Sequence, residues 1–122
     1  MQNAMPNTDI SRMQILLQAG LYEEAIRCGN DALTHNPHST AVIKLIGKGM
    51  MALQGFAEAR EALEVALRID PQDRETLSDL GAICMKLGDK KAAIQYFAHL
   101  VVLNDQDPEA HYKLGLAFEN DE

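Results

Sequence analysis

The chain has 122 residues, and its 11 lysines and arginines against 18 aspartates and glutamates give a formal net charge of −7. Apolar residues make up 47% of it, which is typical of a globular domain and excludes a disordered or low-complexity chain. The negative charge argues against nucleic acid as a partner, because phosphate backbones bind basic surfaces. No apolar run approaches the roughly 20 residues that cross a bilayer, so we expect no membrane insertion.

Residues 1–5 contain neither the basic nor the apolar region of a signal peptide, and we expect them to be disordered. Cys28 and Cys84 lie far apart in unlike contexts, so we expect free thiols and a cytoplasmic location. His35 and His38 belong to a turn, and no set of metal ligands converges on either of them. The sequence therefore predicts no metal and no cofactor.

A period of 34 residues runs through the chain. It relates alanines, glycines, prolines and capping residues of successive units, among them Ala25, Ala59 and Ala93; Gly47, Gly81 and Gly115; Ser39, Asp73 and Asp107; and Pro37 and Pro71. Several independent series at one interval indicate a repeat. They divide the chain into units at 6–39, 40–73 and 74–107, followed by a partial unit at 108–122.

Each unit has the pattern of two helices joined by a tight turn. Within 40–73, apolar residues recur at helical spacing in 43–50 and again in 56–67, on either side of Gln54-Gly55. One such unit cannot bury both faces of its helices, so the units must stack on one another. The predicted fold is therefore all-α, a solenoid of seven helices.

Glycine and proline mark the expected helix ends. We expect Gly20, Gly55 and Gly88 to end the first helix of each unit in a left-handed conformation, which a residue without Cβ adopts easily. Pro37 and Pro71 are expected to end the second helix, because proline cannot continue its hydrogen bonds. Residues of N-cap type precede the first helices of the later units, at Ser39, Asp73 and Asp107.

Small residues at fixed positions predict close packing between helices. We expect Gly47 to face Ala59 where two paired helices cross, because larger side chains would push the axes apart. Gly81 and Ala93 form the equivalent pair one unit later. Ala66 would allow the following unit the same close approach.

These motifs resemble those of the tetratricopeptide repeat (TPR) family, whose 34-residue unit carries small helix residues, a Gly-x-Tyr-x-x-Ala stretch and a closing proline. The first unit matches at Gly20, Tyr22, Ala25, Ala32 and Pro37. The later units match at Gly47, Phe56, Ala59, Ala66 and Pro71, at Gly81, Gly88, Ala93 and Phe97, and from Pro108 to Gly115. The departures are Arg12-Met13, Leu100 and Asp105. The resemblance implies a right-handed α-solenoid of about 3.5 TPR repeats.

The resemblance also implies a concave groove, lined by the first helix of each repeat, in which such proteins mostly bind peptides or partner helices. The groove-facing positions carried over by register are Ile10, Gln14, Leu17, Lys44, Lys48, Met51, Ser78, Ala82, Met85, Tyr112 and Leu116, with Lys86 nearby. One subset of the family holds the C-terminal carboxylates of heat-shock chaperones with lysine, arginine and asparagine. The corresponding positions here lack those residues and carry Ile10, Gln14, Leu45, Ser78 and Ala82, so that specialised role is not expected.

Two hypotheses concern what the groove binds. Lys44 and Lys48 lie four residues apart on one helical face, which favours a receptor for a carboxylate or an acidic peptide. The alternative for these lysines is a solvated helix face. Met51 and Met85 would add an apolar component that anchors an amphipathic helix or an extended peptide, unless they belong to the core.

The last segment, 108–122, is expected to form a helix with no second helix to cover it. Leu114 and Phe118 would then leave part of an apolar face exposed. Three explanations are open: the chain is part of a longer protein, it forms a weak homodimer through this helix, or the helix is a cap.

The segment is predicted not to be an enzyme, because it has no phosphate-binding glycine loop, catalytic triad or metal set. The leading interpretation is a non-enzymatic protein–protein interaction module that binds a peptide or partner helix. It would serve as an adaptor, a scaffold or a chaperone, and secretion chaperones with three such repeats are one example. The alternatives are a regulatory segment of a larger enzyme such as a transferase, and a self-associating structural array.

Overall fold

The computed structural model describes residues 6–119, so residues 1–5, for which disorder is predicted, and 120–122 lie outside the described part. Residues 6–119 form seven α-helices and no strand: α1 (Pro6–Gln18), α2 (Tyr22–His35), α3 (Thr40–Ala52), α4 (Phe56–Ile69), α5 (Arg74–Leu87), α6 (Lys90–Leu103) and α7 (Pro108–Glu119). The predicted all-α fold is confirmed. Helices α3, α5 and α7 begin at intervals of 34 residues.

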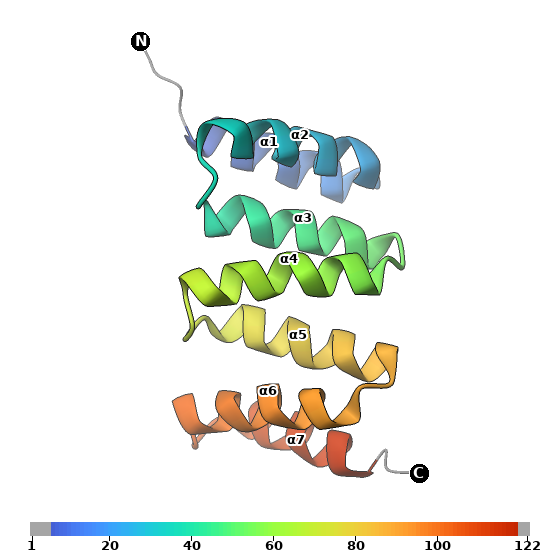
Figure 1. Cartoon of the computed structure of the whole chain (residues 1–122), viewed down its shortest axis with the longest axis vertical. Coiled ribbons are helices and arrows are strands. Elements are labelled where there is room, and N and C mark those ends of the chain that lie inside the picture. Colours follow the sequence, from blue (N-terminus) through green and yellow to red (C-terminus); the bar gives the residue numbers. More distant parts are fainter. Residues whose placement is uncertain (1–5, 120–122) are drawn as a thin grey trace.

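The helices stack along one axis, with α1 and α7 at opposite ends (Figure 1). Each helix packs against the next one in the chain, and α1 also contacts α3. Ion pairs join α3 to α5, and a hydrogen bond from Lys113 to Ser78 joins α7 to α5. Helices α1, α3, α5 and α7 therefore share one side of the stack, which we call the A face.

The core lies between the helices and runs the length of the stack. Met13 near the N-terminal end, Leu63 in the middle and Leu77 and Ile83 in α5 have no exposed surface. Each helix contributes only one stripe to this core, and the opposite stripe faces solvent. This is why the units need one another to fold.

Glycines on the first helices admit large side chains from the second helices. A Cβ at Gly47 would lie 2.8 Å from Cδ2 of Leu63, and a Cβ at Gly81 would overlap the ring of Phe97. The predicted close approach is present, but the partners are Leu63 and Phe97, one helical turn beyond the expected alanines. The bulky side chain fills the space that the glycine leaves.

Gly115 occupies the same register on α7, yet a Cβ there would meet no atom within 4 Å. The residue that would fill this space in an earlier unit comes from the following second helix, and none follows α7 in the described chain. The C-terminal end of the stack is therefore open at this position.

The turns after α1, α3 and α5 are alike. In each, two backbone N–H groups reach back to the end of the helix, as from Leu21 to the Leu16 carbonyl at 2.9 Å and from Gly20 to the Leu17 carbonyl at 3.1 Å. Gly20 and Gly88 adopt the left-handed conformation, each with φ of +80°.

In the second unit the left-handed residue is Gln54, with φ of +69°, while Gly55 has φ of −85°. The prediction for Gly55 was therefore wrong. Gln54 lies 34 residues from both Gly20 and Gly88, so the period places the turn at this position although the glycine stands one residue later.

The expected N-caps behave differently from one another. The Ser39 hydroxyl accepts a hydrogen bond from the Val42 N–H at 3.3 Å. Asp73 precedes α5, but its carboxylate makes no backbone cap and binds the Thr76 hydroxyl and Lys44 instead. Competition from a lysine on the neighbouring helix explains this difference.

Replacing Gln54 with glycine should stabilise the protein. The left-handed conformation strains a residue with a Cβ by about 1 kcal/mol or more, whereas glycine gives back part of the gain as entropy of the unfolded chain. We expect a net gain of about 0.5 kcal/mol in the free energy of unfolding, measured by urea denaturation. Gln54→Ala, which keeps the Cβ, should show no such gain, and equal stability of the two variants would contradict the assignment.

Alanine at two glycines of one register should have opposite effects. Gly81→Ala should lower the free energy of unfolding by about 1–3 kcal/mol, because its methyl group meets the Phe97 ring. Gly115→Ala should raise it by about 0.5–1 kcal/mol, because the space is open and alanine favours the helix. Thermal unfolding of both variants tests this, and a destabilised Gly115→Ala would show that the position is covered.

Candidate functional site

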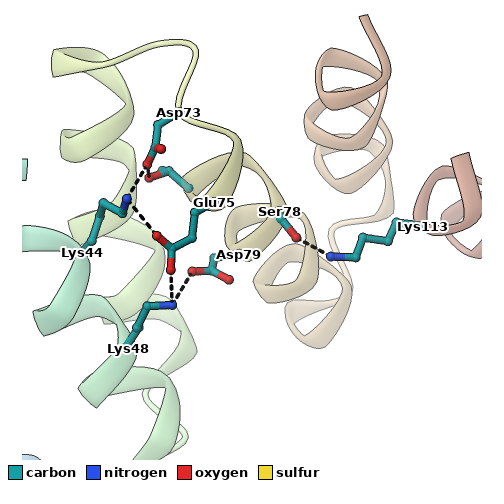
Figure 2. A network of polar contacts seen from close by, with 8 residues as sticks. Lys44, Lys48, Asp73, Glu75, Ser78, Asp79 and Lys113 are labelled. Atoms are coloured by element: carbon teal, nitrogen blue, oxygen red, sulfur yellow. Dashed lines mark hydrogen bonds and ion pairs between the residues drawn. The ribbon is translucent and has the colours of Figure 1, made fainter. Parts of the chain in front are cut away.

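Five charged side chains connect α3 to α5 on the A face (Figure 2). Lys44 lies 2.9 Å from Asp73 and 2.8 Å from Glu75, measured from Nζ to carboxylate oxygen. Lys48 lies 2.7 Å from the other oxygen of Glu75 and 3.3 Å from Asp79. Glu75 thus bridges the two lysines, and we call these five residues the lysine–carboxylate ladder.

The ladder shifts the pKa values of its members in different directions. Hydrogen bonds from Lys44 and Lys48 lower the pKa of Glu75. Burial alone would lower the pKa of Lys44, but hydrogen bonds to Glu75 and Asp73 outweigh it and raise the pKa. Burial raises the pKa of Asp79, and the charge of Lys48 offsets this only in part. Glu75 is therefore the carboxylate that gains most from the ladder, while Asp79 is held in it at a cost.

The ladder bears on the expectation that Lys44 and Lys48 receive an external carboxylate. Both lysines already contact carboxylates of their own chain, and three carboxylates face these two ammonium groups. Neither lysine lies on a solvated face, and neither is available as a donor without breaking ion pairs. The spacing of the lysines indicated their common face, but their partners come from the next repeat.

A second set of polar contacts links α5 to α7. Ser78 accepts a hydrogen bond from Lys113, on the side of α5 away from α3 (Figure 2). Arg74 at the start of α5 pairs with Asp107. These contacts cross a polar cleft of about 270 Å³, into which Lys48 also reaches. The Nη1 atom of Arg74 is buried and has no hydrogen-bond partner among the residues described.

A larger pocket opens between the second halves of α5 and α7, with a volume of about 640 Å³. It is lined by apolar, glycine and lysine residues and by no carboxylate: Ala82, Met85, Lys86, Gly88, Lys90, Phe97, Lys113 and Leu116. We call it the terminal pocket. Pockets of this size and largely apolar lining are typical of ligand sites.

The structure brings together four of the residues predicted for the groove. Ala82, Met85, Lys86 and Leu116 line the terminal pocket, although sequence register placed them only on a common face. Two others, Lys48 and Ser78, line the polar cleft, and Lys44 belongs to the ladder.

The remaining predicted residues line neither pocket. Gln14 is exposed, Leu17 is half-buried, and Tyr112 is 66% exposed. Ile10 and Met51 are half-buried and pack against the core, so part of their surface is taken by the fold.

Three residues of the terminal pocket were missed by sequence reasoning: Lys90, Phe97 and Lys113. A signal for Lys90 was present, because it stands in the register that Tyr22 and Phe56 occupy in the first two units. A lysine at a position otherwise aromatic indicates a change in packing. Nothing in the sequence alone shows that Lys113 turns toward α5.

The end of α7 differs in part from expectation. Phe118 is 56% exposed, as predicted, but Leu114 is half-buried against the core cluster that contains Leu77 and Phe97. The apolar side chains left in solvent on this helix are Phe118, Tyr112 and, at 38% exposure, Leu116.

Other chemistry was sought in the residues that the structure describes. Cys28 and Cys84 are free thiols, and burial raises the pKa of Cys84, which disfavours its reactive thiolate. Over the described range, no three histidine, cysteine or acidic side chains form a group that could hold a metal ion. No helix in that range is long and apolar enough to span a membrane.

The sequence model of the tetratricopeptide repeat family matches residues 50–116, more than half of the chain. The chain belongs to the tetratricopeptide repeat family. No curated protein matches it significantly.

Solved structures of TPR proteins share the fold. MamA aligns with a TM-score of 0.85 at 24% identity over 93% of this chain, which spans 62% of the MamA chain. The first TPR of Spaghetti (RPAP3), bound to the HSP90 peptide SRMEEVD, aligns with a TM-score of 0.86 at 18% identity, over 93% of this chain and 90% of that one. YrrB, a TPR protein with an unusual peptide-binding site, aligns with a TM-score of 0.82 at 25% identity, over 92% of this chain and 58% of that one.

Neutralising the two outer carboxylates of the ladder should have opposite effects on stability. The pKa of Glu75 is lowered by folding, so its stabilisation is present above its ordinary pKa and is lost as the pH falls through the lowered value. Glu75→Gln should therefore lower the free energy of unfolding at pH 7 by about 0.5–1 kcal/mol, a modest value because the side chain is half exposed.

The pKa of Asp79 is raised, so protonation favours the folded state and that benefit is lost as the pH rises through the raised value. Asp79→Asn should leave stability at pH 7 unchanged or increase it. Urea denaturation at pH 7 and pH 4, in low and high salt, measures both variants. Equal losses at pH 7 would show that the two carboxylates contribute alike.

Proposed function

We propose that the chain is a non-enzymatic protein–protein interaction module that binds a peptide or a helix of a partner protein on its A face. Adaptor, scaffold and chaperone roles all follow from such binding. The observation that carries this proposal is the terminal pocket, where Ala82, Met85, Lys86 and Leu116 meet on the predicted binding face. A preformed, largely apolar pocket of about 640 Å³ suits the side chains of an extended peptide or helix.

Family membership supports the same proposal. Structures with this fold include one bound to an HSP90 peptide and one described as having an unusual peptide-binding site. The positions of the chaperone carboxylate clamp carry other residues here, including Ser78, which is occupied by Lys113. We therefore propose a peptide class different from chaperone C-termini.

Further parts of the proposal concern setting and partners. The free thiols support a cytoplasmic location, and the net charge of −7 supports protein rather than nucleic acid as the partner. Because the chain spans only 62% of the MamA chain, we keep a regulatory segment of a larger enzyme as an alternative. A weak homodimer through α7 is a second alternative, supported by Phe118 and the open space at Gly115.

Selection of a phage-displayed library of random peptides on the immobilised protein tests peptide binding. We expect peptides to be enriched and their binding to be lost in Ala82→Arg, because this exposed residue borders the terminal pocket and a long side chain would obstruct it. Ala57→Arg is the matched control, since Ala57 is exposed on α4 away from the A face. Fluorescence polarisation of the enriched peptides measures both variants.

Three outcomes separate the alternatives. Loss in Ala82→Arg alone supports binding on the A face. Equal binding by both variants would place the site elsewhere, and a library without binders would contradict the proposal. Sedimentation velocity at increasing protein concentration reports self-association, and a dimer abolished by Phe118→Ser would favour the homodimer instead.

A further inference from the structure

The terminal pocket lies where the third unit lacks an aromatic ring. The second helix of the first two units opens with Tyr22 and Phe56, and the same register of the third unit carries Lys90. Phe56 is half-buried and packs against the core cluster formed by α4 and α5 that contains Leu63. One period later, Lys90 and Phe97 line an open pocket instead. A ring that fills the wall in an earlier unit is missing here.

The charge around this pocket differs from the rest of the A face. Its lining side chains include Lys86, Lys90 and Lys113 and no carboxylate, in a chain with a net charge of −7. Lys113 also contacts Glu109 at 3.4 Å, a residue outside the lining. In the lysine–carboxylate ladder, by contrast, carboxylates outnumber lysines. An acidic ligand is therefore attracted to the terminal pocket rather than to the ladder.

The floor of the pocket is suited to an aromatic side chain. Met85 and Leu116 form its walls beside the buried Phe97 ring. Methionine sulfur and an aromatic ring both make favourable contacts with a second ring, and ammonium groups at the edge favour the face of that ring as well.

We propose that the terminal pocket binds an aromatic side chain of a partner peptide whose neighbouring residues are acidic. The ring takes the place of the chain's own missing ring, and the flanking carboxylates pair with the lysines at the edge. This inference rests on the proposed function, because it names the ligand of the same face.

The decisive variant is Lys90→Phe, which restores the aromatic residue of the first two units. The probe is a fluorescein-labelled synthetic peptide of seven residues, with a central phenylalanine flanked by two glutamates on each side. Lys90→Phe should weaken its binding by about ten-fold or more, the loss typical when a buried aromatic anchor is excluded. Its midpoint of thermal unfolding should stay equal or rise, which separates a filled pocket from an unfolded protein.

Charge is tested separately from space. Lys90→Ala keeps the pocket open and should weaken binding only a few-fold, and Lys86→Glu should weaken it in a salt-dependent way. Lys91→Glu is the control, because Lys91 is exposed on α6 and does not line the pocket. A second peptide with alanine in place of the phenylalanine should bind no variant detectably.

The outcomes distinguish this inference from the proposed function. If the peptide library yields binders that Ala82→Arg loses but Lys90→Phe retains, the A face binds peptides and the aromatic anchor is wrong. Binding of the alanine peptide as strongly as the phenylalanine peptide would also overturn it. A library without any binder would overturn both proposals.

Discussion

The close approach of paired helices at Gly47 and Gly81 is the constraint on which the rest of the structure depends. Leu63 and Phe97 enter the space above these glycines, so the first helix of a unit rests directly on the second. This contact sets the distance between helices and thereby the spacing of first helices along the A face. The ladder between α3 and α5, and the pockets between α5 and α7, all lie across that spacing.

Two kinds of surface result on one face. Between α3 and α5, lysines and carboxylates of successive units satisfy one another, which stabilises the stack and leaves little charge for a ligand. Beyond α5, the wall is open and carries lysines without carboxylates. The difference arises from a few positions in one register: Phe56 gives way to Lys90, and Asp79 gives way to Lys113. A repeat architecture lets such exchanges alter one site without altering the fold.

Sequence reasoning reached the fold and much of the candidate site, and its errors have a common cause. It assigned the turn of the second unit to Gly55 because glycine favours positive φ, although the period pointed to Gln54. It paired Gly47 with an alanine because it considered size alone, whereas the structure uses a large side chain to fill the gap. It viewed Lys44 and Lys48 as one helical face, without the carboxylates of the next unit. In each case a local preference was read without its neighbour in space.

The sequence by itself determined the repeat, its period, and the helices with their approximate ends, because periodicity, glycine and proline act through the local backbone. Only the tertiary structure decided which lysines are neutralised and which line an open pocket. Those outcomes depend on side chains that are 30 or more residues apart and compete for the same space and charge, as Lys48 and Asp79 do across 31 positions. No local pattern encodes the result of such a competition, so ion pairs and pockets emerge only when the units are stacked.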